Sequence, residues 1–548
     1  MKLETFFEKF DQFADAPDAV AKMRELILRL AMQGKLVSQN PRDKPADSLV
    51  VELKAEVGDK NSRRTAPLPP IAPDEIPFEL PAGWVWERLG NIGETNIGLT
   101  YSPQDVSDVG TPVLRSSNVQ NGKLDFDDLV RVTCEPKQSV MVQDGDLLIC
   151  ARNGSRALVG KVALIENLKE PAAFGAFMAI FRSRVNRFLY HFICSPLFRR
   201  MIDEVNTTTI NQITQNNLRS TLAPIPPLAE QKRIVAKVDE LMALCDRLEA
   251  QQQERETRHA ALARASLARF ADAPTPANLS FLFHPSYAIP PADLRKSILT
   301  LAVQGKLVPQ DPNDEPAEEL FARIERTKEK LIKERTIKRV SIEANPSGEE
   351  CESLPPGWLW TRLGHSFDVR DGTHDTPKYT TDGFPLITSK NIYSGSLLFE
   401  GANLISEKDH RQISERSRVE RWDILFAMIG SIGNPVIVDT DREFSIKNVA
   451  LFKYYSAADA EPRFLLLYLK LVAEEMKAKA AGAVQSFVSL GFLRNYLFPL
   501  PPLAEQRRIV AKVDHLMALV DALETQLAAS HATAANLLSA LVAELTAA

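Results

Sequence analysis

Cysteine, histidine and long apolar runs are scarce in this 548-residue sequence. Five cysteines form no Cys-x-x-Cys pair and eight histidines show no metal-ligand spacing, so we expect neither a disulfide framework nor a metal site. No apolar run approaches the roughly 20 residues of a membrane-spanning helix. The first ten residues mix charged and apolar side chains, unlike a secretory signal. We therefore expect a cytoplasmic protein without a membrane contact.

An excess of positive charge is also missing, because 66 lysines and arginines face 71 aspartates and glutamates. A free-standing protein that binds DNA without sequence preference needs a basic face that displaces counterions from the phosphates. If DNA is the ligand, the basic residues have to be clustered in space, or a partner has to supply much of the phosphate contact.

Sequence motifs of catalysis are absent as well. There is no NPPY or DPPY tetrapeptide of an amino-methyltransferase, no GxxxxGK[ST] phosphate loop and no HExxH metal motif. We therefore expect a chain that is not itself an enzyme and holds no cofactor of its own, with catalysis in another subunit.

What the sequence does contain is an internal duplication. Residues 226–244 read PPLAEQKRIVAKVDELMAL and residues 501–519 read PPLAEQRRIVAKVDHLMAL, so 17 of 19 positions are identical. A match of this length does not arise by chance. The duplication predicts a pseudo-symmetric molecule that binds or reads something twice.

Two further pairs of segments repeat in the same order. Residues 33–37 (QGKLV) recur at 304–308, and residues 80–90 (LPAGWVWERLG) recur at 354–364 as LPPGWLWTRLG. The fixed positions of Trp84, Trp86, Trp358 and Trp360 favour core packing over the alternative, stacking on bases.

The stretches between the tryptophan motif and the repeated helix, 91–215 and 365–490, align only at scattered points. Each contains short apolar strands followed by Gly-Ser turns, and later helical patches, which is typical of a compact mixed α/β domain. Near-identical frame segments with divergent segments between them predict one scaffold that carries two different readers.

Apolar residues step by four and three through both copies of the repeated helix, as in a heptad seam. We expect the helices to reach about residues 270 and 545, roughly 60 Å each. An ordinary helix packed on its own domain is the alternative, but matching seams favour two long helices, expected to be antiparallel, that pack on each other as a spacer. The seam residues are Ile234, Val238, Leu241, Cys245 and Leu248 in the first helix and Ile509, Val513, Leu516, Val520 and Leu523 in the second.

These segments resemble the DNA-specificity subunit of type I restriction-modification systems. The resemblance rests on LAEQ(K/R)RIVAKVD at 228–239 and 503–514, on the two LPxGWxWxRLG segments and on the twofold layout. Residues 370–377 (RDGTHDTP) also look like a family element, which the first half lacks. The departure is the long leader, residues 1–75, with its echo at 285–345. Contact with a methyltransferase is a hypothesis for its role.

The resemblance implies a set of partners. Each variable segment would be a target recognition domain that reads one half of a bipartite site in double-stranded DNA. The helices would hold the two domains apart and dock DNA adenine methyltransferase subunits, two of them, and restriction/translocase subunits would join the larger complex. That complex would use S-adenosylmethionine, together with ATP and Mg²⁺ when the restriction subunit is present.

We therefore expect a mixed α+β architecture, in which two α/β target recognition domains are separated by two long antiparallel coiled-coil helices. The expected segments are an N-terminal helical leader (1–77), recognition domain 1 (78–225), a central spacer helix (226–275), a second leader repeat with a linker (276–351), recognition domain 2 (352–500) and a C-terminal spacer helix (501–548).

Specificity would come from side chains that reach base edges, with Arg or Lys on guanine and Asn or Gln on adenine. At each single position, a solvated loop or turn residue is the alternative. The DNA-binding candidates are Arg115, Ser117, Asn118, Arg152, Asn153, Arg156, Asn211, Gln212, Gln215 and Asn216 in the first domain, and Thr373, His374, Lys378, Tyr379, Ser389, Lys390, Asn391 and Lys447 in the second.

Two other functions are also consistent with the sequence. The chain could be the DNA-recognition subunit of another restriction type, paired with a fused methyltransferase-nuclease, or a coiled-coil adaptor that never touches DNA. Divergent readers on a near-identical frame argue against the adaptor. We therefore predict a non-catalytic subunit that recognises a bipartite DNA target and directs methyltransferase and restriction subunits to it.

Overall fold

The computed structural model describes residues 16, 18–61, 67–205, 211–283, 288–346, 353–393, 395–480 and 487–547. The chain divides into two compact units. Unit 1 comprises residues 1–255 and 530–548, and unit 2 comprises residues 256–529. Each unit therefore contains one variable segment and parts of both long helices.

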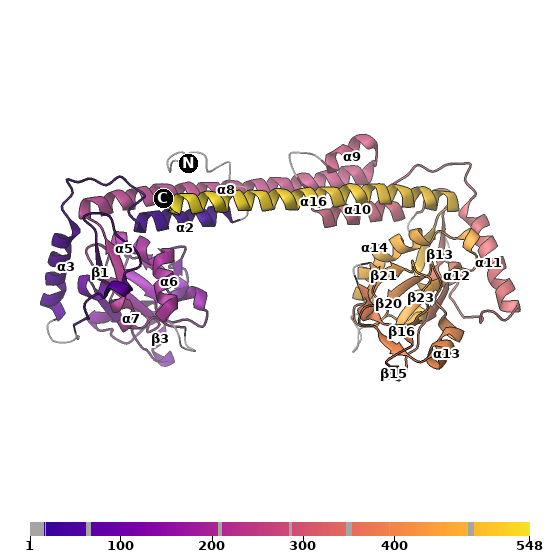
Figure 1. The fold of residues 1–548 in the computed structure, drawn as a ribbon, viewed down its shortest axis with the longest axis horizontal. Coiled ribbons are helices and arrows are strands. Elements are labelled where there is room, and N and C mark those ends of the chain that lie inside the picture. The colour runs from indigo at the N-terminus through magenta and orange to yellow at the C-terminus, as the bar shows by residue number, and fades with distance from the viewer. Residues whose placement is uncertain are drawn as a thin grey trace. The chain divides into compact units, whose positions relative to one another are not determined.

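Unit 1 combines two four-stranded sheets and two two-stranded sheets with helices that come before and after them in the chain (Figure 1). Its helices are α2 (Ala19–Met32), α3 (Ala46–Asn61), α4 (Leu89–Ile92), α5 (Asn186–Ile193), α6 (Pro196–Val205) and α7 (Gln215–Ser220), with the first part of α8 (Leu228–Asp272) and the last part of α16 (Leu503–Ala547). Its strands are β1 (Val85–Arg88), β2 (Glu94–Ile97), β3 (Val106–Ser107), β4 (Thr111–Leu114), β5 (Val119–Gln120), β6 (Lys123–Leu124), β7 (Val130–Val132), β8 (Leu147–Cys150), β9 (Val162–Leu164), β10 (Ala173–Phe174), β11 (Met178–Arg182) and β12 (Leu222–Ile225).

Unit 2 follows the same plan. Its helices are α9 (Pro276–Leu282), α10 (Pro291–Val303), α11 (Ala317–Lys333), α12 (Leu363–Ser366), α13 (Glu407–Ser417), α14 (Pro462–Ala480) and α15 (Leu490–Asn495), with the last part of α8 and the first part of α16. Its strands are β13 (Leu359–Arg362), β14 (Asp368–Asp371), β15 (Tyr379–Thr380), β16 (Phe384–Ile387), β17 (Ile392–Tyr393), β18 (Ser396–Leu397), β19 (Asn403–Ile405), β20 (Ile424–Ala427), β21 (Gly433–Ile437), β22 (Ser445–Ile446), β23 (Val449–Lys453) and β24 (Leu497–Leu500).

The two variable segments have the same strand topology, although their sequences align only at scattered points. One antiparallel sheet has the order β2-β11-β8-β9 in unit 1 and β14-β23-β20-β21 in unit 2. A second sheet has the order β10-β4-β7-β3 in unit 1 and β22-β16-β19-β15 in unit 2, with one parallel pair at the matching edge. The frame strands pair as β1 with β12 and β13 with β24, both antiparallel. The divergent segments therefore share one fold.

The sheet that contains β8 is the middle layer of unit 1. All four β8 side chains are buried, and they alternate between two cores because successive side chains of a strand point to opposite faces. Leu147 and Ile149 pack with residues of α5 and α6, whereas Leu148 and Cys150 pack with residues of the second sheet. In unit 2, Ile424 and Phe426 of β20 pack with residues of α14, whereas Leu425 packs with residues of the second sheet. Core packing therefore constrains the side chains on both faces of this sheet, whereas the sequence of its loops is free to differ between the units.

Two helices of 45 residues each, α8 and α16, connect the two units in opposite chain directions. α8 begins in unit 1 and ends in unit 2, whereas α16 begins in unit 2 and ends in unit 1. At 1.5 Å per residue, each is about 68 Å long. The predicted fold class, two mixed α/β domains with two long antiparallel helices, is confirmed.

The ten predicted seam residues are buried, except Leu523, which is partly buried. In unit 1, the seam of α8 packs in one core with the leader helix α2 and with Leu538 near the end of α16. In unit 2, the seam of α16 packs with the leader helix α10 and with Phe270 near the end of α8. Figure 1 shows α2 and α10 lying along the long helices. The seam residues thus pack against two helices in each unit, and the heptad pattern alone did not predict the leader helix as a partner.

Ion pairs with the same layout join each leader helix to a long helix. A guanidinium nitrogen of Arg24 in α2 lies 2.7 Å from carboxylate oxygens of both Asp246 and Glu249 in α8. Arg295 in α10 makes the same two contacts with α16, at 2.6 and 2.7 Å. The carboxylates are exposed, so each pair adds little stability by itself. The leader therefore has a structural role within each unit, which is packing on the start of a long helix.

A buried glutamate in the first turn of each long helix joins three frame segments, an arrangement that we call the glutamate clasp. Glu230, which is 1% exposed, accepts hydrogen bonds from the indole nitrogen of Trp84 at 3.1 Å and from the side-chain amide of Gln39 at 2.7 Å. Glu505 accepts the same two bonds in unit 2, both at 2.9 Å. Burial raises the pKa of both carboxyl groups, because the charged form loses solvation. The clasp fixes the leader and the tryptophan motif to the long helix.

The QGKLV repeat contains a glycine that this close packing requires. Gly34 has a φ of 68°, and a Cβ atom built on it would lie 2.5 Å from Cγ of Pro81. Gly305 has a φ of 66° and would meet Pro355 at the same distance. Only glycine adopts this conformation without strain and leaves room for the proline.

The tryptophans of the frame lie toward the core. Trp84 and Trp358 are 6% exposed, and Trp86 and Trp360 are partly buried. The indole nitrogen of Trp86 donates to the carbonyl oxygen of Phe78 at 3.2 Å. The prediction of core packing rather than base stacking is confirmed.

We expect Glu230→Ala to destabilise unit 1 by about 1–3 kcal/mol, because the buried N–H groups of Trp84 and Gln39 would lose their acceptor. Urea unfolding followed by tryptophan fluorescence measures the difference. Burial raises the folded-state pKa of Glu230, so the folded protein binds the proton of this carboxyl group more tightly than the unfolded chain does. The resulting contribution to the free energy of unfolding is largest below the unfolded-state pKa and is lost as the pH rises through the folded-state pKa. Glu240, exposed on the same helix, is the matched control, and Glu240→Ala should change stability by less than about 0.5 kcal/mol. Equal effects of the two substitutions would contradict the clasp.

Candidate nucleic-acid interface

Antiparallel pairing brings several loops to one edge of the middle sheet in each unit. In unit 1, the ends of β2 and β8 lie beside the start of β11. Isolated bridges join Leu99 to Gly175 and Arg152 to Gln212, and so tie the loops together. We call these loops the loop edge of unit 1, residues 97–99, 151–154, 175–177 and 211–212.

Unit 2 has the same arrangement at the ends of β14 and β20 and the start of β23. Its isolated bridges join Thr373 to Lys447 and Ile429 to Phe487. The loop edge of unit 2 comprises residues 371–374, 428–430, 447–448 and 487. The bridges of the two units occupy matching places in the topology, so the two loop edges are equivalent surfaces.

Four of the predicted DNA-binding residues meet at the loop edge of unit 1: Arg152, Asn153, Asn211 and Gln212. The backbone N–H of Asn153 donates to the carbonyl oxygen of Asn211 at 3.3 Å, and the side-chain amide of Asn211 donates to the carbonyl oxygen of Gly154 at 3.1 Å. Arg152 is exposed, and its guanidinium carbon lies 5.5 Å from the ring centroid of Phe177, over which it stacks. The structure thus gathers donors and acceptors of the kinds that base edges would require, namely three side-chain amides and one cation.

Two predicted residues, Asn118 and Asn391, are buried and hold their own loops together. Asn118 is 1% exposed, and its amide donates to the carbonyl oxygens of Asp125 and Asp128 at 3.1 and 2.9 Å. Asn391 is 7% exposed and accepts from the backbone N–H and the hydroxyl of Thr388 at 3.0 and 3.1 Å. Their side chains are occupied by these contacts, which local sequence does not reveal.

The other predicted residues of unit 1 lie outside the loop edge as defined. Three of them have partners in the protein: Arg115 with Asp128 at 3.2 Å, Arg156 with Asp203 at 3.0 Å, and Gln215, which donates to the carbonyl oxygen of Thr95 at 2.5 Å. Ser117 and Asn216 are exposed.

In unit 2, Thr373, His374 and Lys447 lie on the loop edge. Ser389 lies close to it, since a Cβ atom built on Gly430 would be 3.5 Å from the Ser389 hydroxyl. The remaining predicted residues, Lys378, Tyr379 and Lys390, are exposed, and Tyr379 begins β15. For the residues of both units, contact with DNA stays a prediction.

Exposed apolar side chains at both loop edges were missed by sequence reasoning. Phe177 and Ile97 in unit 1 are 61% and 55% exposed, and Phe487 and Ile429 in unit 2 are 50% and 41% exposed. Apolar side chains at a nucleic-acid interface contact thymine methyl groups or wedge between bases. Apolar residues beside buried strands are typical of a core, so no local signal distinguished these four.

The chain lengths between matching strands differ at this edge. Three residues, 175–177, connect β10 to β11 in unit 1, whereas two residues, 447–448, connect β22 to β23 in unit 2. Unit 1 thereby presents Phe177 where unit 2 presents Lys447 and Asn448. The same point of the fold thus carries different chemistry in the two units.

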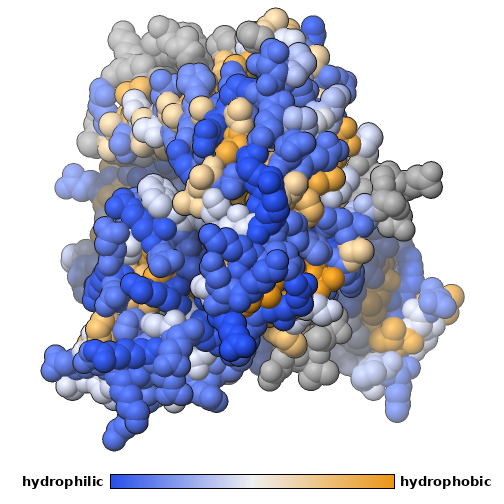
Figure 2. Space-filling view, turned by 90° about the vertical axis from the view of Figure 1, so that its right-hand side faces the viewer, coloured by the Kyte–Doolittle hydropathy of each residue, from blue (hydrophilic) through white to orange (hydrophobic). Residues whose placement is uncertain are grey.

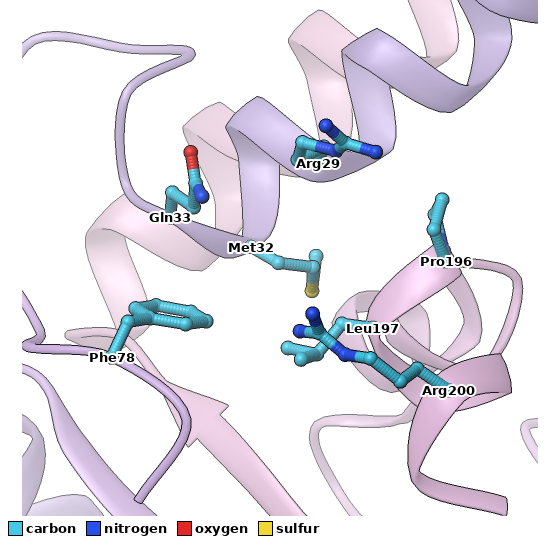
Figure 3. A pocket seen from close by; sticks show the side chains of 7 residues that line it. All are labelled: Arg29, Met32, Gln33, Phe78, Pro196, Leu197 and Arg200. Carbon is cyan, nitrogen blue, oxygen red and sulfur yellow. The ribbon is translucent and has the colours of Figure 1, made fainter. Parts of the chain in front are cut away.

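Three pockets formed by described residues have linings outside the loop edges. In unit 1, a pocket of about 300 Å³ lies between α2 and α6, with Met32, Phe78 and Leu197 around it and Arg29 and Arg200 beside it (Figure 3). The face of the molecule in Figure 2 is mostly hydrophilic, with hydrophobic residues in small scattered groups. Among the described residues, no group of three or more His, Cys, Asp or Glu side chains has the arrangement of a metal site. No helix in the described ranges combines the length and the apolar character that crossing a membrane requires.

Comparison with known proteins agrees with this layout. The family model described as "Type I restriction modification DNA specificity domain" matches residues 81–256 and 369–530. The chain therefore belongs to the family of type I restriction-modification DNA specificity proteins. The two matches cover most of the variable segment of each unit and the beginning of the long helix that follows it.

Individual relatives match over nearly the whole chain. The specificity subunit of the type I restriction enzyme EcoAI of Escherichia coli is 31% identical, and the match covers 95% of this chain and 93% of the relative. The EcoEI specificity subunit of Escherichia coli is 29% identical with the same coverage. Among solved structures, the HsdS subunit of Thermoanaerobacter tengcongensis is 20% identical, and the match covers 86% of this chain and 98% of that one with a TM-score of 0.43.

Proposed function

We propose that this chain is the DNA sequence-specificity subunit of a type I restriction-modification complex. Each variable domain reads one half of a bipartite target in double-stranded DNA through its loop edge, and the chain directs methyltransferase and restriction subunits to that target. The observation that carries the proposal is that two domains of one topology present different side chains at the same edge, on a frame whose sequence is nearly the same twice. The family match supports it over the adaptor hypothesis.

The charge of the chain bears on how it binds DNA. The formal net charge is −5, and each loop edge carries few cations. Phosphate contacts supply most of the salt-dependent affinity of a DNA-binding protein, whereas base contacts supply specificity. We infer that the partner subunits supply much of the phosphate contact, so that this chain contributes selectivity.

Catalysis belongs to the partners in this proposal. The sequence has no amino-methyltransferase tetrapeptide and no phosphate loop. We place S-adenosylmethionine on DNA adenine methyltransferase subunits, and ATP and Mg²⁺ on the restriction/translocase subunit. The frame is present twice, so it offers two equivalent docking places, which supports two methyltransferase subunits per chain. The complex acts on cytoplasmic DNA.

The long helices set the distance between the half-sites in this proposal. α8 and α16 each pass from one unit to the other, and residues 255–256 and 529–530 mark where they change units. A helix rises 1.5 Å per residue, so its length converts directly into a spacing along DNA.

A map of N6-methyladenine across the source genome, with and without this gene, tests the function. We expect deletion to remove one bipartite motif, made of two specified blocks with a fixed unspecified gap. Restoring the gene should restore the motif, and a chain without its variable segments should not. Survival of every methylated motif would contradict the proposal and favour the adaptor.

Phe177 and Phe487 provide a matched pair of substitutions. If each loop edge reads one half-site, Phe177→Ala should lower kcat/KM for methylation about tenfold because contacts to one half-site are lost. Phe487→Ala should have the same effect through the other half-site. The measurement uses the complex with its methyltransferase subunits and duplexes in which single base pairs of one half are changed. The same half responding to both substitutions would argue against one reader per domain.

Insertion of one heptad into both long helices, after Arg255 and after Ala529, tests the spacer. Seven residues add about 10 Å, so we expect the unspecified gap to lengthen by up to about three base pairs while both half-sites stay the same. Methylation mapping of a strain that carries only the lengthened chain reads the new gap. An unchanged gap in an active complex would refute the spacer role.

A further inference from the structure

A chain of side-chain contacts holds the loop 372–378 of unit 2 to its sheet. Asp371, the last residue of β14, is 4% exposed. One of its carboxylate oxygens accepts a hydrogen bond from the guanidinium of Arg416 in α13, and the other lies 2.9 Å from Nε2 of His374. The second ring nitrogen of His374, Nδ1, lies 3.0 Å from the side-chain oxygen of Asn448. These four side chains connect α13, β14 and the start of β23 through the loop.

The backbone of the loop is bridged at the same place. The N–H of Thr373 donates to the carbonyl oxygen of Ile446 at 3.0 Å, and the N–H of Asn448 donates to the carbonyl oxygen of Thr373 at 3.2 Å. Farther along the loop, the ammonium of Lys447 donates to the hydroxyl of Thr376. The loop is therefore fixed to the segment 446–448 by both backbone and side chains.

Both ring nitrogens of His374 are committed to partners within the protein, although the side chain is 56% exposed. A base edge would have to compete with a buried carboxylate for Nε2, and hydrogen bonds to ionised groups are among the stronger ones in proteins. The geometry therefore fits a residue that positions the loop better than one that reads a base.

Unit 1 lacks this arrangement at the matching positions. Its loop begins with the same close approach of backbones, because a Cβ atom built on Gly98 would lie 2.2 Å from a carbonyl oxygen, and one on Gly372 would lie 2.1 Å from one. Ile97 stands where unit 2 has Asp371, and Thr100 stands where unit 2 has His374. A short turn, residues 138–140, replaces α13. The feature is thus specific to the second domain.

We propose that Asp371 and His374 form a latch that holds the loop 372–378 in the conformation that reads the second half-site, and that both are positioning residues. This inference rests on the proposed function. A loop that is ordered before DNA arrives does not have to be ordered on binding, so the latch strengthens the discrimination of the second domain without a base contact of its own. Selectivity at the first half-site does not depend on it.

Amide hydrogen exchange tests the latch without DNA, on the full chain in complex with its methyltransferase subunits. In His374→Ala, we expect the amides of Thr373 and Asn448 to exchange about tenfold faster, because the loop opens more often. His374→Gln can still donate to Asp371, so it should restore part of the protection. Thr100→Ala, at the matching position of unit 1, is the control and should leave the exchange of both amides unchanged.

The second arm measures kcat/KM for methylation of duplexes that carry the mapped bipartite motif, intact or with one base pair changed. For His374→Ala, we expect discrimination at the second half-site to fall about tenfold, discrimination at the first half-site to stay the same, and His374→Gln to recover part of the loss. A purely structural role would affect both half-sites through loss of folded protein.

The outcomes separate the two proposals. Unchanged exchange in His374→Ala overturns the latch, whatever the duplexes show. Faster exchange with unchanged discrimination at the second half-site also overturns it, because the loop would then not be the reader. If the unaltered complex shows no sequence discrimination, the proposed function fails, and the latch as a reading device fails with it, while the exchange measurement still shows whether Asp371 and His374 order the loop.

Discussion

The frame of this protein depends on the burial of one carboxyl group at the start of each long helix. A carboxylate that is removed from water needs hydrogen-bond donors within reach, and the fold supplies an indole and an amide from two other segments of the chain. Glu230 thereby determines what the leader and the tryptophan motif have to contain. The three segments that repeat most clearly in the sequence are the ones that meet at this group, in unit 1 and again around Glu505 in unit 2. Both copies of the frame therefore make the same contacts.

The loop edges are under the opposite constraint. The strands of the middle sheet are packed on both faces, so their side chains are confined to apolar residues that fill two cores. The loops that join them contact solvent and can change in length and chemistry at little cost in stability. One inserted residue is enough to place Phe177 in unit 1 where unit 2 has Lys447 and Asn448. A rigid scaffold with variable loops at one edge is well suited to reading two different short sequences.

The two domains differ in the contacts that hold the loops of the loop edge as well as in the side chains that these loops carry. In unit 2, Asp371 is a buried acceptor between α13 and the loop, and His374 extends that contact to the start of β23. Unit 1 has an exposed Ile97 at the place of the acceptor and an arginine stacked on Phe177 nearby. Hydrogen bonds to ionised groups are directional and so restrict the conformation of a loop. Apolar and stacking contacts are less directional and restrict it less. Within one topology, the duplication therefore carries two differently organised loop edges.

The sequence by itself determined the duplication, the helical seam and the fold class, because repetition and periodicity are local properties that survive without coordinates. It also indicated that the frame tryptophans belong to the core. The tertiary structure alone decided which polar residues are available for contact. Asn118 and Asn391 belong to candidate loops in the sequence, yet strand pairing buries them as the hydrogen-bonding centres of those loops. Phe177 resembles a core residue in the sequence because it precedes a buried strand, yet it lies in the loop before β11 and is 61% exposed. For the leader, the sequence offered only contact with a methyltransferase as a hypothesis, whereas the tertiary structure showed that α2 and α10 pack on the long helices. In each case the physical reason is the same: burial is decided by what lies opposite in space, and residues far apart in the chain supply it.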